Sequence, residues 1–226
     1  MFDRLIRIIG EDNLNKLNSK RVLVLGLGGV GGLATETLIR NGITNIIIVD
    51  NDKIDITNKN RQIIALDSNI GTLKVDAFEK RIKDINKDTN IIKISEFIDE
   101  NNIDLLFKYN PDYIIDACDS VNTKVSLIKE CLNRNIKFIS CMGMGKKMDI
   151  SKLKIMDIKK TNYDKLAKVI RKRLKDENIV GKVTVLSSDE NVINTKEVIG
   201  SYSPVTMSAG IYLADYIIKE IIKEND

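Results

Sequence analysis

The sequence predicts an α/β protein with a doubly wound, Rossmann-like and mostly parallel sheet. Residues 21–25 form a short apolar, β-branched run that ends at a glycine, which is typical of a buried strand. A glycine-rich loop and an expected helix over about 30–41 come next, followed by a second apolar strand over 45–50. Because strand, helix and strand fit within about 30 residues, we expect a right-handed βαβ unit with parallel strands.

The same alternation continues along the chain, and we expect one domain over 1–226. Helices are predicted over 72–86, 121–134, 163–175 and 204–223, and strands over 91–95, 113–117, 137–141, 153–158 and 182–186. The nucleotide-binding core should cover about 20–145. A smaller C-terminal extension over 146–226 should hold a basic, substrate-binding part and a closing helix, with a polar, loop-rich stretch at 187–203.

The composition excludes several classes of chemistry. The 226 residues contain no histidine and three cysteines, none in a C-x-x-C pair, so a Cys/His zinc site and a Ser-His-Asp triad are excluded. No run of about 18 apolar residues occurs, so we expect no membrane span. Early charges at Asp3 and Arg4 argue against a secretory signal, and we expect a cytoplasmic protein.

The glycine loop predicts a phosphate-binding site. Gly26, Gly28 and Gly31, with Gly29 between them, satisfy G-x-G-x-x-G between a strand and a helix. Glycines let the backbone approach a phosphate, and the helix start offers free N–H groups. Asp50 ends the second strand, where an acidic side chain can bind ribose hydroxyls. These residues alone fit NAD and ATP equally well.

Later charges favour ATP over NAD. A triphosphate carries more negative charge than a dinucleotide pyrophosphate and needs fixed cations, usually with a magnesium ion. Arg61 and Lys74 are candidates for the phosphate cations, and Asp119, just past a strand end, is a candidate ligand of Mg²⁺. An NAD-binding oxidoreductase or redox sensor is therefore disfavoured, while a nucleotide-binding module without catalysis stays an alternative.

Together these spaced motifs resemble the ThiF/MoeB/HesA superfamily of adenylating enzymes, which are related to ubiquitin-activating enzymes. The resemblance rests on Gly-x-Gly-Gly-x-Gly and on the residues Asp50, Asp52, Asn58, Arg61, Gln62, Lys74, Asp116, Asp119 and Ser120. It implies that ATP is bound by these residues, with Asp50 on the ribose, Asn58, Arg61 and Lys74 on the phosphates, and Asp119 on the metal. It also implies a homodimer in which Arg4, or failing that Arg7, reaches the nucleotide of the partner.

Within the superfamily, the chain is most similar to the tRNA threonylcarbamoyladenosine dehydratase branch. The similar stretches include residues 142–149, 157–161 and 166–171. The resemblance implies that ATP adenylates the carboxylate of threonylcarbamoyladenosine in tRNA, after which internal attack closes a ring and expels AMP. The resemblance does not decide whether the protein also binds a monovalent cation or acts with a sulfur-relay partner protein.

The alternative within the superfamily is activation of the C-terminal carboxylate of a small ubiquitin-like sulfur carrier. No cysteine follows Cys141, which disfavours a thioester or acyl-disulfide route in the C-terminal half. The segment 159–175 has eight basic residues and one acidic residue, and its apolar positions leave the charges on one side, as for RNA backbone contact. The candidate RNA-binding residues are Lys159, Lys160, Lys168, Arg171, Lys172 and Arg173.

Overall fold

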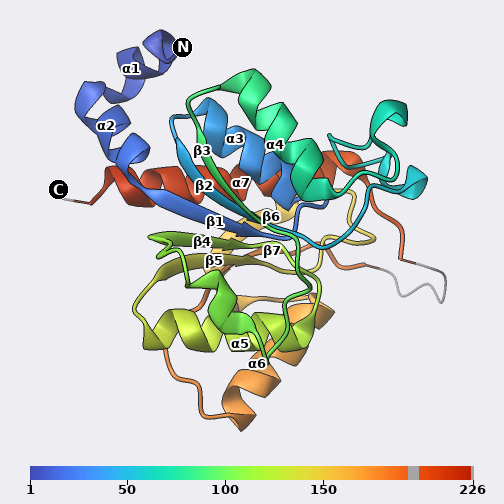
Figure 1. The fold of residues 1–226 in the computed structure, drawn as a ribbon. Helices are drawn as coiled ribbons and strands as arrows, with labels where there is room; N and C mark the ends of the chain where they lie inside the picture. The colour runs from blue at the N-terminus through green and yellow to red at the C-terminus, as the bar shows by residue number, and fades with distance from the viewer. Residues whose placement is uncertain (193–198, 225–226) are drawn as a thin grey trace.

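A computed structural model describes residues 1–192 and 199–224, and its centre is a seven-stranded sheet (Figure 1). The strands are β1 (Arg21–Leu25), β2 (Asn45–Val49), β3 (Asn90–Ile94), β4 (Tyr113–Asp116), β5 (Lys137–Cys141), β6 (Leu153–Asp157) and β7 (Thr184–Ser188). Their order is β3-β2-β1-β4-β5-β7-β6. Every neighbouring pair is parallel except β6 and β7, which confirms the predicted doubly wound, mostly parallel sheet.

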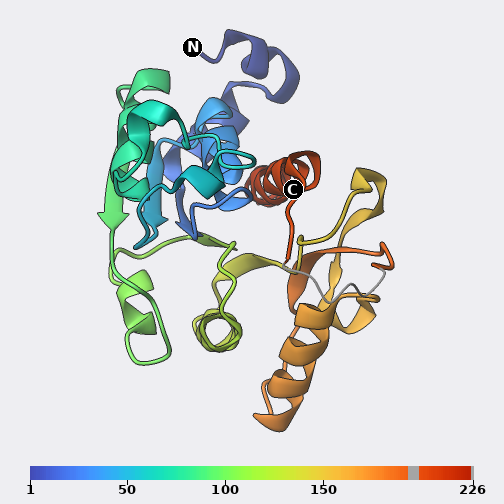
Figure 2. The ribbon, with the colours of Figure 1, turned by 90° about the vertical axis from the view of Figure 1, so that its right-hand side faces the viewer.

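Helices cover both faces of the sheet. They are α1 (Asp3–Ile9), α2 (Glu11–Ser19), α3 (Gly31–Arg40), α4 (Lys74–Ile85), α5 (Val121–Asn133), α6 (Lys165–Asp176) and α7 (Ser203–Ile222). Figure 2 shows α3, α4 and α7 on one side of the sheet and α5 and α6 on the other. None of the helices in residues 1–192 and 199–224 is long and apolar enough to cross a membrane.

The period of two along each central strand divides the core into two layers. In β1, Val22 and Val24 face the core beneath α3, α4 and α7, while Leu23 and Leu25 face the core beneath α5 and α6. All four side chains are buried. Both faces of the strand therefore lie inside the protein, which is why its sequence is a continuous apolar run rather than an alternating one.

The C-terminal helix α7 packs very closely on α3. A Cβ atom at Gly210 would lie 2.4 Å from the carbonyl oxygen of Val30, at the start of α3. Because only glycine allows this approach, α7 supports the loop that precedes α3. The closing helix predicted at the C-terminus is thus part of the wall behind the glycine loop.

The sequence-based boundaries were wrong in two places. The helices α1 and α2 were not predicted, because they are short and bury only Leu14 and Leu17. The strand predicted over 182–186 instead spans 184–188, so Ser187 and Ser188 are not in a loop. Both serines are buried because they pair with Lys154 and Leu153 of β6. This pairing joins distant segments and cannot be predicted from a polar stretch of sequence.

Candidate nucleotide-binding site

The loop between β1 and α3 lies against the backbone after β4. Gly26 has a φ of 87°, and a Cβ atom there would lie 2.8 Å from the carbonyl oxygen of Ala117. A Cβ atom at Gly31 would lie 1.8 Å from the carbonyl oxygen of Gly26. Glycine at both positions is therefore required by the backbone itself. The loop marks the crevice where the strand order reverses, since β2 and β4 flank β1 on opposite sides.

A cavity of about 510 Å³ opens at this crevice, beside the carboxyl ends of β1, β2 and β4. It brings together most of the residues that the sequence predicts for the site. The predicted residues that line it are Gly26, Gly28, Gly29, Asp50, Asp52, Asn58, Arg61, Gln62, Lys74, Asp119 and Ser120. Gly31, Asp116 and Arg4 do not line it.

Asp50 is fixed by the glycine loop and by its own strand end. Its Oδ2 accepts a hydrogen bond of 2.7 Å from the N–H of Leu27, and its Oδ1 accepts one of 2.9 Å from the N–H of Asp52. Lys74, at the start of α4, places its Nζ 2.7 Å from Asp52 and 3.4 Å from Asp50. The carboxylate of Asp50 is thus held at the edge of the cavity, and the ammonium of Lys74 is shared between two acids.

The charge around the cavity is unbalanced. Within residues 1–192 and 199–224, the charged lining residues are two cations and four carboxylates: Arg61, Lys74, Asp50, Asp52, Glu96 and Asp119. Backbone N–H groups offset part of this charge, because no side chain of the described residues caps the N-terminus of α3 and its first turn contains no acid. An anion can therefore bind at the glycine loop, but a highly charged anion needs a further cation.

Two amide side chains form part of the cavity wall, and the Nε2 of Gln62 would lie 3.9 Å from a Cβ atom at Gly28 of the glycine loop. Gln62 is buried, and its Oε1 has no hydrogen-bond partner among the described residues. Because an unsatisfied buried polar atom is costly, this amide is suited to a ligand that supplies the partner. Asn58 accepts a hydrogen bond of 3.1 Å from the N–H of Asp55 in a capping box, which orders the turn that precedes Arg61.

Asp119 and Ser120 follow β4 and lie on the cavity wall. Within residues 1–192 and 199–224, no side chain or backbone group pairs with the exposed carboxylate of Asp119. Ser120 instead caps α5, with its Oγ accepting a hydrogen bond of 3.3 Å from the N–H of Thr123. Asp119 is therefore available to a cation, while Ser120 orders the turn that carries it.

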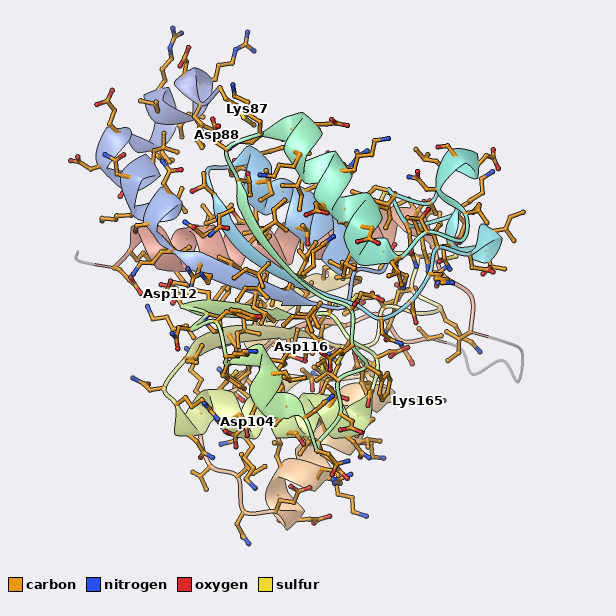
Figure 3. All side chains as sticks on the ribbon, in the orientation of Figure 1. Lys87, Asp88, Asp104, Asp112, Asp116 and Lys165 are labelled. Carbon is orange, nitrogen blue, oxygen red and sulfur yellow. The ribbon has the colours of Figure 1, made fainter. Side chains whose placement is uncertain are left out.

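Asp116 lies beneath this wall, in a fully buried ion pair with Lys124 of α5 (Figure 3). Its Oδ2 lies 2.9 Å from Lys124 Nζ and accepts a hydrogen bond of 2.5 Å from Ser140 Oγ. Its Oδ1 accepts a hydrogen bond of 3.2 Å from the N–H of Cys118. Asp116 is thus positioned to hold the turn before Asp119. Its predicted contact with the nucleotide stays a prediction.

The protonation states of this buried group follow from its neighbours. Burial would lower the pKa of Lys124, but the charge and hydrogen bond of Asp116 leave that pKa raised, so the lysine stays charged. Burial, with a contribution from Asp116, raises the pKa of the Cys118 thiol well above its usual range. A protonated thiol is a poor nucleophile, which favours a structural role for Cys118.

The cavity also includes residues that the sequence analysis missed. They are Glu96 and Phe97 after β3, Met144 and Gly145 after β5, Ser201, and Thr206 on α7. The positions after β3 and β5 could have been suspected, because the carboxyl ends of parallel strands meet at one edge of the sheet. Thr206 could not, since only the packing of α7 on α3 brings it there.

The remaining predicted residues lie elsewhere. Arg4 is on α1, and Figure 1 shows α1 and α2 together near the start of β1, whereas the cavity lies at the carboxyl ends of the strands. Lys159 and Lys160 precede α6, and the other four predicted RNA-binding residues lie on α6. Arg171 turns inward to Thr161 and the carbonyl of Ile158, and Arg173 pairs with Glu177. The outer charge of the basic segment is therefore carried mainly by its lysines.

Known proteins share both the sequence and the shape of this chain. A tRNA threonylcarbamoyladenosine dehydratase from Bacillus subtilis is 44% identical over 196 residues, which are 87% of this chain and 77% of that protein. The crystal structure of the Escherichia coli tRNA N6-threonylcarbamoyladenosine dehydratase, TcdA, in complex with ATP superposes with a TM-score of 0.93. That match has 32% identity and covers 98% of this chain and 93% of TcdA. The AMP complex of the same enzyme gives a TM-score of 0.92 at 32% identity, covering 96% and 92%.

The family assignment follows from the extent of these matches. The model of the ThiF family matches residues 2–226, which is nearly the whole chain and includes the glycine loop, the cavity and the closing helix. The resemblance inferred from the spaced motifs is thereby confirmed, including its dehydratase branch. The chain belongs to the ThiF family.

Proposed function

We propose that this protein is an ATP-dependent dehydratase that acts on threonylcarbamoyladenosine in tRNA. One observation carries the proposal: the glycine loop, Asp50, Arg61 and Asp119 line a single cavity, in a chain that matches an ATP-bound dehydratase along 98% of its length. An NAD site would not need the phosphate cation or the free carboxylate. If the protein instead activated a carrier protein, the same cavity would still bind ATP, and only the acyl substrate would differ.

The reaction has two steps. A carboxylate oxygen of the threonylcarbamoyl group attacks the α-phosphorus of ATP, a P–O bond forms, and pyrophosphate leaves. A nucleophile within the same modified nucleoside then attacks the activated carbonyl carbon, and AMP leaves with the former carboxylate oxygen. The net change in the nucleoside is the loss of water. The protein contributes mainly positioning and neutralisation of charge, for which no histidine is needed.

The lining residues suit distinct parts of ATP. Asp50 is held where it can accept hydrogen bonds from the ribose, and Gly28 and Gly29 line the cavity, where their backbone N–H groups would bind the phosphates. Arg61 and Lys74 supply the cations for the phosphates. When ATP binds, the ammonium of Lys74 would be shared between Asp52 and a phosphate oxygen. The unsatisfied amide of Gln62 supplies a further polar contact.

A magnesium ion fits the donor set. The described residues contain no group of three or more His, Cys, Asp or Glu side chains that could hold a metal on their own. Mg²⁺ often binds through one carboxylate together with substrate phosphates and water, which matches the exposed carboxylate of Asp119 on the cavity wall. When bound, the ion would neutralise charge on the phosphates, which the excess of acids around the cavity makes necessary.

The other expected partners are a second copy of the chain and tRNA. Each is inferred from where the residues that would contact it lie. Since Arg4 lies away from the cavity of its own chain, it could serve a nucleotide only in a second subunit of a homodimer. The lysines on and before α6 would contact the tRNA backbone, and a tRNA substrate favours a cytoplasmic location. A monovalent cation and a sulfur-relay partner stay predictions.

The decisive experiment is a product assay. The protein is mixed with ATP, magnesium and tRNA that carries threonylcarbamoyladenosine. We expect AMP and pyrophosphate to be released while the nucleoside loses the mass of one water, detected by mass spectrometry after digestion. Pyrophosphate exchange that depends on a small carrier protein, with no change in the tRNA, would establish the carrier-activating alternative instead.

Replacing Asp119 with alanine tests the magnesium site. We expect the magnesium concentration for half-maximal turnover to rise by at least about tenfold, because even the loss of an outer-shell group costs a metal site that much affinity. The matched control is Glu96→Gln, which removes a second exposed carboxylate of the lining, one that follows β3 instead of β4. An unchanged magnesium dependence in Asp119→Ala, with normal turnover, would exclude Asp119 as the ligand.

A further inference from the structure

A second cavity, of about 270 Å³, lies beside the nucleotide cavity. Its walls are the loop after β5, the start of α6 and the residues that flank the undescribed segment 193–198. Gly145 lines both cavities, so the loop after β5 is the partition between them. A group held in the second cavity therefore lies next to whatever occupies the first.

The walls of the second cavity are fixed by hydrogen bonds. Asp164 accepts bonds from the N–H of Gly143 at 3.1 Å, the N–H of Ala167 at 2.9 Å and the hydroxyl of Ser187 at 3.1 Å. One buried carboxylate thus joins the loop after β5, the first turn of α6 and β7. The cavity is built before any ligand arrives, as expected for a binding site.

The chemistry of the lining suits an anionic, aromatic ligand. Among the described lining residues, the charged ones are Lys146, Lys147, Lys165 and Asp164, and Asp164 accepts hydrogen bonds from Gly143, Ala167 and Ser187 of the protein itself. Lys147 is buried and donates a hydrogen bond of 2.6 Å to the carbonyl of Glu190; burial lowers its pKa, although the nearby carboxylates of Asp164, Glu190 and Asp189 partly oppose that shift. The lining therefore carries a net positive charge that faces a neighbouring ATP site.

Tyr163 adds an aromatic surface at the same place. It is 63% exposed, although it lines the cavity, and its φ of 54° lies in the left-handed region that a bulky residue rarely adopts. It directly precedes α6, on whose first turn Lys165 lies (Figure 3). An exposed ring between a basic helix and a cavity is suited to stack on an unpaired RNA base.

We infer that this second cavity binds the modified adenosine of the RNA, with the base stacked on Tyr163 and the threonylcarbamoyl carboxylate directed past Gly145 toward ATP. The inference rests on the proposed function and names the place of its second substrate. When RNA binds along the basic face of α6, one of its unpaired nucleotides lies at the start of that helix, next to the second cavity. The lysines around the cavity attract the carboxylate. The boundary that it crosses is narrow, because a Cβ atom at Gly145 would lie 2.5 Å from Cγ2 of Ile199, so only a glycine fits beside that side chain.

Tyr163→Ala in the full-length protein tests this assignment. We expect the KM for modified tRNA to rise about tenfold because a base loses its stacking partner, while the KM for ATP changes less than twofold. Tyr163→Phe should behave like the wild type, since stacking needs the ring and not the hydroxyl. Asn162→Ala, in the same turn but outside the cavity, is the matched control and should leave both KM values unchanged.

A binding experiment separates base stacking from backbone contact. The probes are an unmodified tRNA transcript with adenosine at the modified position and the same RNA with an abasic site there. Tyr163→Ala should weaken binding of the first RNA about tenfold and leave the second unchanged. Equal weakening for both RNAs, or an unchanged KM for modified tRNA, would overturn the inference while wild-type dehydration still supports the proposed function. A wild-type protein that dehydrates no tRNA would overturn both.

Discussion

Replacing Lys124 with methionine is expected to lower the free energy of unfolding by about 3–5 kcal/mol, measured by urea denaturation. The substitution keeps the apolar stem but removes the ammonium that lies 2.9 Å from Asp116. The carboxylate would then be fully buried, and its remaining hydrogen-bond donors among the described residues would be Ser140 and the N–H of Cys118. A buried charge without its counterion is among the most costly defects in a protein interior.

Two further variants make this result interpretable. Lys129→Met changes an exposed lysine of the same helix and should alter stability by no more than about 0.5 kcal/mol. The double variant Lys124→Met with Asp116→Asn removes the uncompensated charge and should recover part of the loss. If Lys124→Met unfolds at the same urea concentration as Lys129→Met, the buried pair does not contribute to stability as its geometry implies.

Replacing Arg61 with alanine is expected to reduce kcat for AMP release by about 10²–10³-fold, because a fixed cation near the reacting phosphates is lost. The fold should be unaffected, since the guanidinium contacts only the carbonyl of Thr57, at 3.1 Å, and the amide of Asn60, at 3.0 Å, among the described residues. Rates are measured with saturating ATP and modified tRNA, and stability is measured in parallel. The loss should therefore appear in catalysis and not in the unfolding curve.

The neighbouring lysine provides the matched control for Arg61. Lys59 lies on the same turn but outside the cavity, where its ammonium pairs with Asp67 at 2.7 Å. Lys59→Ala removes the same charge from the same segment and should leave kcat within about twofold, because exposed ion pairs contribute little. Equal effects of the two substitutions would mean that general surface charge, and not a phosphate contact, explains the role of Arg61.

Much of the site could be predicted from the sequence because its signals are local. Gly26, Gly28 and Gly31 stand at fixed spacing between a strand and a helix, and the backbone contacts at Gly26 and Gly31 explain why glycine is needed there. Asp50 directly follows β2 and Asp119 comes shortly after β4, and the carboxyl ends of these two strands meet at one edge of the sheet. Chain order alone places such residues near one another in a parallel sheet.

Other parts of the molecule depend on contacts between distant segments. The antiparallel pairing of β6 with β7 and the entry of Thr206 into the cavity involve residues far apart in the chain. The burial of Lys124 is of the same kind, because lysine is normally exposed and only the fold places it between Asp116 and Ser140. The sequence by itself therefore determined the fold class, the glycine loop and the acids and cations that face it, since the alternation of strands and helices along the chain and the spacing of residues within motifs are local properties. Only the tertiary structure decided how the loop is supported, which charges are already paired, and that a second cavity adjoins the first, because each of these results from packing between elements that the chain order does not bring together.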